Sequence, residues 1–411
     1  MPELARKSIA ACALFLSVGL ARADDPFDRL KLRLNGSVSL VGAYVDQTNQ
    51  AGLDEVVLAV DAGLFGSAIL PLDGGDVIGA RMALDLDYAT NFDSFINDAG
   101  SSNVLGELWA FWEGDFGRVQ LGLSDGAADI LGLVVPSVSS RMRIDTSEIF
   151  LLGYPCSLFC SSKNQQPGSL FSPNGMQLRT DIHSSDDFNK IIYTTPSFAG
   201  LRLSVSYTPD GTRDPGQLFG DDEINEQAHI WDFAVGYVTT FGEVDLGLSA
   251  GFVTGENVNN TAPGFFGDVE DYGTAARIGY REWTLGGAWR RTNVAGGGPI
   301  VQGFSSNVFD SLYTEIWSVG LTYERGPWMV GANYIEADEE IPFSTANQDG
   351  QGAQLSAGYI FNENVRLVAG WQHFEFSGPF GVCPTDSGGI FFPPCDTLDG
   401  DIGFLESTFS F

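Results

Sequence analysis

The stretch LKLRLNGSVSLVGAY, residues 30–44, carries apolar or small residues at every second position and polar residues between them. Leu32 and Leu34 fall on one face, whereas Arg33 and Asn35 fall on the other. Successive side chains of a β-strand point to opposite faces. The spacing therefore predicts a strand that is apolar on one side and polar on the other.

The same alternation recurs along the chain, for example in VIGARMALDLDY (77–88), LRLSVSY (201–207) and FLESTFSF (404–411). Both a soluble β-sandwich and a membrane β-barrel produce this pattern. Beyond residue 23 we expect no transmembrane helix, because no segment offers about 18 consecutive apolar residues. Only helices and closed barrels satisfy every backbone amide in lipid, so the choice lies between a barrel and a secreted soluble protein.

Three features favour the barrel. Aromatic residues such as Tyr44 and Trp328 close the apolar faces at strand ends, as in the aromatic girdles of membrane proteins. The opposite faces often carry glycine, as at Gly286 and Gly320, where a filled soluble core needs bulk. Short connections such as ERGPW (324–328) alternate with long polar ones, as the turns and external loops of outer-membrane barrels do.

We therefore predict an all-β chain, a 16-stranded antiparallel transmembrane β-barrel. The last strand should pair with the first and place Phe411 at a membrane interface. The expected strands are 30–45, 55–66, 77–89, 103–113, 118–124, 188–195, 201–208, 229–239, 244–254, 272–280, 283–292, 312–324, 328–338, 352–360, 365–376 and 401–411.

Residues 1–23 are predicted to be a secretory signal peptide, and residues 24–411 the barrel. Arg6 and Lys7 form a basic start, an apolar stretch too short to span a bilayer follows, and the segment ends in Ala21-Arg22-Ala23. An N-terminal anchor helix is the less favoured alternative.

The chain carries 53 acidic and 21 basic residues, a net charge of −32. Without the predicted leader, 52 acidic and 18 basic residues remain, a net charge of −34. Such a surface repels nucleic acid and attracts cations. With 44% hydrophobic and 12% aromatic residues, the chain is too apolar for a disordered protein.

Four cysteines follow the predicted leader, namely Cys156, Cys160, Cys383 and Cys395. An even number in an exported chain favours disulfides, with three possible connectivities. Proximity favours the two local pairings. A four-thiolate zinc site would need closer spacing on both sides.

The segments FGRVQLGLSDGAAD (116–129), NKIIYTTPSFAGLRLSVSY (189–207) and STFSF (407–411) resemble the general porins of Gram-negative outer membranes, in particular the alphaproteobacterial type. The resemblance covers nearly the whole chain after the leader. It implies an outer-membrane location among lipid and lipopolysaccharide, a homotrimer, and a long third loop folded into the lumen as a constriction.

The stretch 125–187 is too long for a structureless loop in a compact domain, and a barrel of this size has a lumen that can accept it. Opposed rows of charge on loop and wall would set a transverse field that filters ions. The alternative is that these charges only hydrate the wall or pair with one another. Candidate loop residues are Asp125, Asp129, Arg141, Arg143, Asp145 and Glu148, and candidate wall residues are Arg33, Arg81, Asp85, Asp87, Glu107, Arg118 and Arg202.

The sequence predicts a channel for passive diffusion of ions and small hydrophilic solutes, with mild cation selectivity because of the acidic excess. Neither a cofactor nor a metal site is implied, and none of His183, His229 and His373 lies in a metal-ligand or catalytic spacing, so no enzyme is expected. A substrate-specific channel is one alternative, weakly indicated by Trp109 and Phe111 on the expected inner face. A secreted β-sandwich binding protein is the other.

Overall fold

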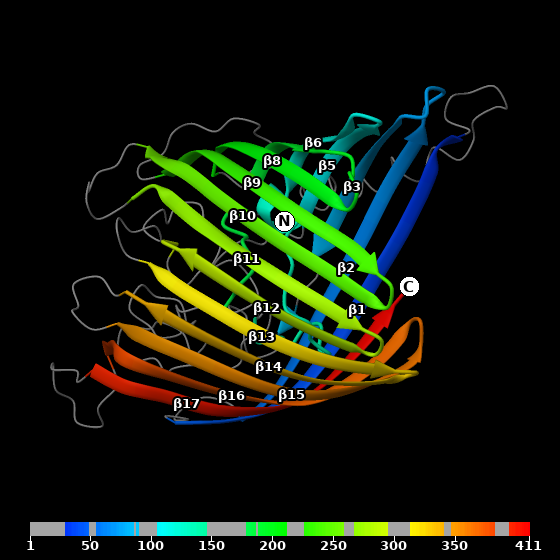
Figure 1. The fold of residues 1–411 in the computed structure, drawn as a ribbon. Helices are drawn as coiled ribbons and strands as arrows, with labels where there is room; N and C mark the ends of the chain where they lie inside the picture. Colours follow the sequence, from blue (N-terminus) through cyan, green and yellow to red (C-terminus); the bar gives the residue numbers. More distant parts are fainter. Residues whose placement is uncertain are drawn as a thin grey trace, which may run out of the picture.

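The computed structural model describes residues 29–48, 55–85, 88–89, 105–145, 178–185, 188–211, 226–258, 267–294, 313–340, 347–382 and 394–411. Nearly all of them form one antiparallel sheet that closes on itself (Figure 1). The elements are β1 (Lys31–Gln47), β2 (Val56–Pro71), β3 (Val77–Asp85), β4 (Tyr88–Ala89), β5 (Leu105–Gly114), β6 (Gly117–Ser124), α2 (Ala127–Ile130), β7 (Phe188–Thr194), β8 (Leu201–Asp210), β9 (Glu226–Phe241), β10 (Val244–Val258), β11 (Val269–Tyr280), β12 (Trp283–Thr292), β13 (Thr314–Arg325), β14 (Trp328–Glu339), β15 (Gln348–Asn362), β16 (Val365–Val382) and β17 (Pro394–Ser410).

Apart from the short strand β4, each strand pairs with its neighbours in sequence, and β1 closes the barrel against β17. The short strand β4 pairs with β2, as β3 does, so the two together make one crossing of the sheet. Counted in this way the barrel has the predicted sixteen strands. Among the described residues, no helix is long and apolar enough to cross a membrane.

The closing pair confirms the expected pairing of the last strand with the first. Gly36 and Phe411 exchange both backbone hydrogen bonds, each with an N···O distance of 3.0 Å. The ring of Phe411 covers Gly36 so closely that a Cβ atom there would collide with it. A larger residue at position 36 would therefore force the ring of Phe411 to move.

Strand bounds differ from the prediction mainly at the ends. The second strand runs on to Pro71 instead of ending near residue 66, because it keeps pairing with both β1 and β3. The last strand begins at Pro394, seven residues before the predicted start, because it follows β16 through a register shift near Phe380. Apolar and polar residues no longer alternate regularly in these extensions. The sequence pattern alone therefore predicts shorter strands.

The outer face of the barrel is apolar and exposed, and aromatic residues ring it at both ends. At the end with the short turns, Trp283 packs against Tyr323 with tilted rings and Trp328 packs edge-to-face against Tyr359, each with 4.7 Å between ring centroids. Towards the long connections, pairs such as Tyr207 with Trp231 and Trp317 with Tyr334 lie 4.7 and 5.3 Å apart. Two aromatic belts that flank an apolar band are the signature of a membrane-spanning barrel.

Candidate functional site: the inner wall and the connection after β6

Strand register places the predicted wall residues on the inner face. Arg33 on β1 and Arg81 on β3 both pair with Ser67 on β2, so the three side chains share one face and one row. Adjacent strands lie about 4.8 Å apart, which separates the two arginine backbones by about 10 Å. Both arginines are exposed towards the lumen.

Aromatic rings on the inner face hold two of the arginines. The guanidinium carbon of Arg118 lies 4.3 Å from the ring centroid of Phe111 and 4.8 Å from that of Trp109. Arg81 approaches the other side of the same cluster, 5.8 Å from Trp109. Glu107 accepts a hydrogen bond from Trp109 Nε1 at 3.2 Å and lies 3.8 Å from Arg81. The wall between β3 and β6 thus carries two cations on an aromatic platform, with the carboxylates of Glu107, Asp125 and Glu113 nearby.

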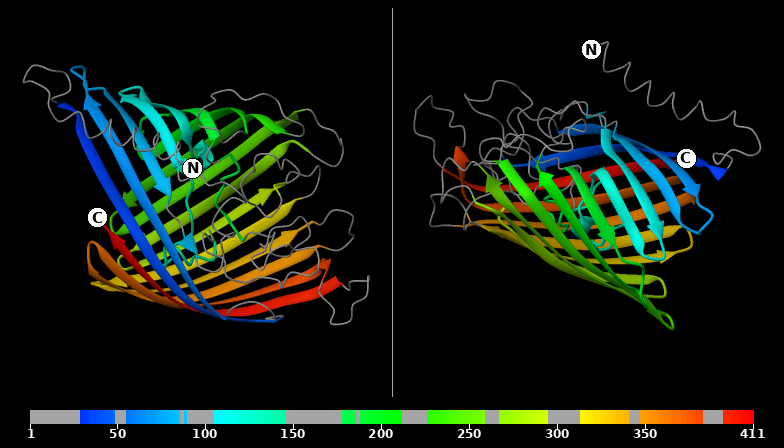
Figure 2. Two further views of the ribbon diagram at one scale, coloured as in Figure 1. Left: turned by 180° about the vertical axis from the view of Figure 1, so that it is seen from behind. Right: turned by 90° about the horizontal axis from the view of Figure 1, so that it is seen from above.

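The connection after β6 runs along the inner face and contacts strands on many sides of the barrel. Backbone N–H groups of Ala127 and Leu133 donate to serine hydroxyls on β8 and β10, at 3.2 and 3.0 Å. Farther along, Asn333 on β14 donates to the carbonyl of Pro136 at 2.7 Å, and Gln372 on β16 donates to that of Met142 at 2.8 Å. A single segment can reach all these strands only from within the closed sheet, which agrees with the position of α2 and the chain beyond it in Figure 2.

Inner-face glycines make room for this connection. A Cβ atom at Gly286 would lie 2.6 Å from Pro136 Cδ, and one at Gly320 would lie 2.5 Å from the Pro136 carbonyl oxygen. A larger residue at either position would push Pro136 away from the wall. The small inner face therefore reflects close contact with the connection as well as an aqueous lumen.

One carboxylate on the last strand fixes the turn at residues 139–141. Glu406 is fully buried on the inner face of β17. Its oxygens accept hydrogen bonds from Ser139 Oγ, from Ser140 N and Oγ at 3.2 and 2.7 Å, and from Arg141 N at 3.3 Å. Arg366 on β16 adds an ion pair at 3.5 Å. Four donors from the connection thus converge on one acid of the wall.

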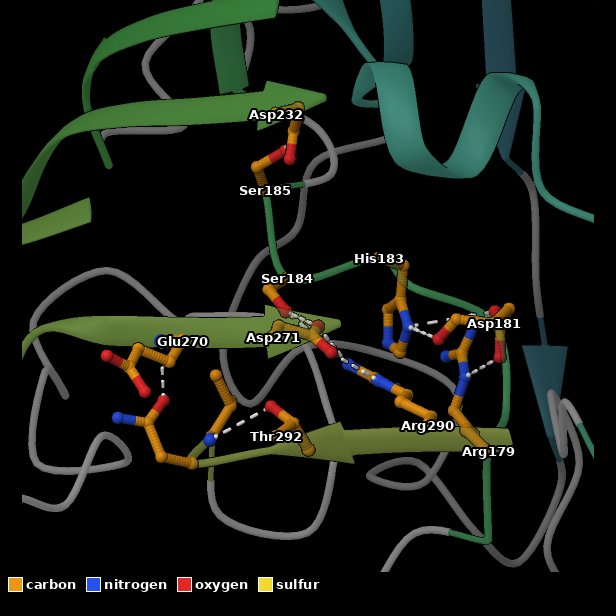
Figure 3. A network of polar contacts seen from close by, with 12 residues as sticks. Arg179, Asp181, His183, Ser184, Ser185, Asp232, Glu270, Asp271, Arg290 and Thr292 are labelled. Atoms are coloured by element: carbon orange, nitrogen blue, oxygen red, sulfur yellow. Dashed lines mark hydrogen bonds and ion pairs between the residues drawn. The ribbon is translucent and has the colours of Figure 1, made fainter. Parts of the chain in front are cut away.

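The returning half of the connection, residues 178–185, is held by a second polar network (Figure 3). Arg290 on β12 and Asp271 on β11 form an ion pair with both side chains fully buried, and Arg290 Nε lies 2.8 Å from Asp271 Oδ1. Ser184 donates to Asp271, and Ser185 donates to Asp232 on β9 at 2.5 Å. The two consecutive serines thereby tie the segment to strands β9, β11 and β12.

Arg179, Asp181 and His183 extend this network, and Figure 3 shows them on one side of Arg290. Burial alone would raise the pKa of Asp181, but Arg179 and His183 outweigh it and lower that pKa. Burial and the charge of Arg179 lower the pKa of His183 well below its ordinary value of 6.5. The imidazole is therefore neutral at pH 7, and its Nε2 atom has no hydrogen-bond partner among the described residues.

The described loop candidates are half-buried or buried. Asp125, just before α2, and Asp129, within it, are half-buried, and burial together with Asp125 and Asp181 raises the pKa of Asp129. Arg141 forms an ion pair with Asp61 of β2 at 2.5 Å.

The prediction that Asp145 lines the pore is wrong. Its side chain has no exposed surface, and Arg143 binds both carboxylate oxygens, at 3.1 and 3.0 Å. Arg143 also donates to the carbonyl of Val135 at 2.8 Å, so the pair stabilises the connection internally.

The remaining candidates are placed as follows. Asp85, Glu107 and Arg202 face inward by register with Gly63, Ala83 and Gly236. Asp87, Glu148, Cys156, Cys160 and Cys383 lie outside the described residues, and only the backbone of Cys395 is described.

A comparison with protein families decides the assignment. The family model of the Gram-negative porins matches residues 9–379. The chain belongs to the Gram-negative porin family. Porins of this family are channels of the outer membrane, and the barrel of this porin is accordingly an outer-membrane protein.

Solved porin structures share the fold. OmpF of Salmonella typhi in complex with daunomycin is 13% identical with a TM-score of 0.59, covering 93% of this chain and 98% of its own. The anion-selective porin from Comamonas acidovorans is 14% identical with a TM-score of 0.55, covering 92% and 100%. The trimer form of OmpT from Vibrio cholerae is 12% identical with a TM-score of 0.56, covering 93% and 100%. No curated relative matches the sequence.

Sequence reasoning missed the wall partners of the connection. Glu406, Asp232, Asp271 and Arg290 are all fully or almost fully buried on the inner face. Each is an ionisable residue that points inward. The inward residues two positions before and after it in the strand are small or apolar, as Phe404 and Thr408 are for Glu406. A search for ionisable residues at inward positions would have found them in this porin.

Proposed function

We propose that this porin forms a water-filled channel for passive diffusion of ions and small hydrophilic solutes. The observation that supports the proposal most strongly is the distribution of side chains across the sheet. Large apolar residues such as Leu355 and Trp371 point outward and are exposed, whereas arginines such as Arg81 and the connection after β6 lie on the inner side. A membrane solvates the first face and water the second.

Two sets of charge act on an ion that enters such a channel. Arg33, Arg81, Arg202 and Arg277 are exposed on the inner face of the described wall. The whole chain carries a net charge of −32, which attracts cations to the protein. We propose that the net negative charge determines the selectivity at low salt and makes the channel mildly cation-selective. The inward arginines reduce this cation selectivity.

The reversal potential in a KCl gradient tests this balance. Arg33→Ala should shift the potential towards stronger cation selectivity, whereas Arg281→Ala, which alters an exposed pair with Glu243 in a turn, should leave it unchanged. At about 1 M salt the Debye length falls to about 3 Å, so the selectivity should weaken. An anion-selective wild-type channel would show that the arginines dominate.

A substrate-specific channel is a second candidate, favoured by the platform of Arg81 and Arg118 on Trp109 and Phe111. Guanidinium groups bind carboxylate or phosphate, and the rings offer apolar surface beside them. Such a site should produce current that saturates or is blocked by an anionic aromatic solute, and Trp109→Ala should abolish that block. A linear dependence on solute concentration supports simple diffusion instead.

We propose a homotrimer embedded among outer-membrane lipid and lipopolysaccharide. The related fold of OmpT from Vibrio cholerae occurs in a trimer form. The exposed apolar outer face gives each protomer a surface that lipid or a neighbouring copy can cover. Chemical cross-linking in native membranes should yield a ladder that ends at three protomers.

A further inference from the structure

His373 lies on the outer face of β16, near the end of the barrel with the long connections. Its chain neighbours Gln372 and Phe374 are buried on the inner face, so the imidazole points to the other side. In the register of the sheet His373 pairs directly with Asp401 on β17. The two side chains therefore stand next to each other outside the barrel.

Three potential ligand atoms converge at this place. One atom each of His373, Asp399 and Asp401 lie within 4.8 Å of one another, and His373 Nδ1 is 3.2 Å from Asp401 Oδ1. Ligands of a tetrahedral zinc ion, each about 2.1 Å from the metal, lie about 3.4 Å apart. Side-chain rotations that bring the three atoms closer by up to about 1.4 Å would therefore form a coordination shell.

Neighbouring groups hold the carboxylates in position. Trp371 Nε1 donates to Asp401 Oδ1 at 3.0 Å. The backbone of Asp399 is fixed by Thr48, the residue after β1, because Thr48 N donates to its carbonyl at 2.8 Å and its N–H donates to Thr48 Oγ1 at 3.0 Å. The ligand set is thus supported by contacts from β16 and from the residue after β1.

The negative charge around His373 favours the binding of a cation. Asp46 on β1 pairs in register with Asp401, which adds a third carboxylate on the same face as Asp399 and Asp401. Among the described residues, the basic side chain that contacts these acids is the imidazole of His373, beside Asp401. Three carboxylates so close together repel one another, and a divalent ion between them would offset that repulsion.

The donor set selects the kind of metal. Ca²⁺ and Mg²⁺ prefer shells made of oxygen alone, whereas an imidazole with two carboxylates suits Zn²⁺ and other divalent ions of the first transition row. Three protein ligands leave one position of a tetrahedral zinc site open.

We propose that His373, Asp399 and Asp401 bind a divalent transition-metal ion such as Zn²⁺ on the outer face of the barrel. The spacing of these residues in sequence gives no sign of it, because the ligands come from two strands that only pairing brings together. The site is separate from the channel, since the inner face of the same strands carries the contacts to the connection.

Competition with a chromogenic chelator tests the proposal on the purified folded protein in detergent, with its thiols blocked by alkylation. The wild type should bind one Zn²⁺ ion per chain at this site in the presence of excess Mg²⁺. Second-sphere changes already cost roughly 10- to 100-fold in metal affinity, so loss of a ligand in His373→Gln should weaken binding by at least about tenfold.

His229→Gln is the matched control, because His229 is exposed and hydrogen-bonds Tyr207 at 2.8 Å instead of a carboxylate. It should bind Zn²⁺ as the wild type does. If His373→Gln fails to fold, Asp399→Asn provides the same comparison. Equal affinity of wild type and the ligand variants, or no zinc binding by the wild type, would overturn the proposal.

Discussion

Replacement of Glu406 by alanine should release the turn at residues 139–141 from the wall while the barrel stays closed. The side chain is fully buried and accepts hydrogen bonds from Ser139, Ser140 and Arg141, next to the cation of Arg366. A hydrogen bond to a charged group contributes about 1.5–3 kcal/mol, so the loss of an acceptor shared by several donors of the connection should cost about 4 kcal/mol, to which the partly exposed Arg366 adds little. Since about 1.4 kcal/mol corresponds to a factor of ten in an equilibrium constant, a loss of about 4 kcal/mol should increase the population of the locally opened turn roughly 100- to 1000-fold.

Hydrogen exchange read by mass spectrometry measures this opening directly, because two of the donors are backbone amides. Peptides that cover residues 137–143 should exchange faster in Glu406→Ala by about the same factor, whereas peptides from β13 should keep wild-type protection. Asp245→Ala is the control, since Asp245 is an inward carboxylate that bonds Thr240 at 2.6 Å and not the connection. Unchanged exchange at 137–143 in a folded Glu406→Ala barrel would refute the assigned role.

Two further predictions concern the network around Arg290. Asp271→Asn leaves the buried guanidinium without its counter-charge and should cost about 3–5 kcal/mol, which lowers the temperature at which the folded band on a detergent gel converts to the unfolded one. The exposed pair of Arg281 and Glu243 provides the contrast, because Arg281→Ala should cost less than about 1 kcal/mol. Because the pKa of His183 is lowered in the folded protein, the unfolded chain binds a proton at this imidazole at a higher pH than the folded chain does. The contribution of His183 to the free energy of unfolding is therefore complete above about pH 6.5 and is lost as pH falls below it. His183→Asn should reduce the change in conversion temperature between about pH 7.5 and 5.5, and an unchanged pH dependence would contradict the neutral, buried imidazole.

The sequence predicts the barrel well because apolar residues alternate with polar ones along each strand. This alternation reflects a sheet with an apolar environment on one face and a polar one on the other. Leu32, Leu34 and Leu40 are exposed on the outer face, and the alternation that begins with them places Arg33 on the inner one. The same parity places Arg81, Asp85, Glu107, Arg118 and Arg202 inward.

Inside the lumen the sequence is a poorer guide, because contacts there join residues that are far apart in the chain. Asp145 is an acid in a long polar loop, which suggested a role in lining the pore, yet Arg143 two residues earlier neutralises it in the interior of the loop. The partners of Ser140 and Ser184 lie 266 and 87 residues away, on strands with no local signal for a contact. Register between strands, which no local pattern encodes, also brings His373 next to Asp401.

Single-channel recording of the refolded protein in a planar bilayer tests the central proposal most directly. A water-filled barrel should insert in discrete steps of current that grow linearly with voltage and with salt concentration. A correctly folded sample, verified by its shifted mobility on a detergent gel, that inserts without conducting would contradict an open channel.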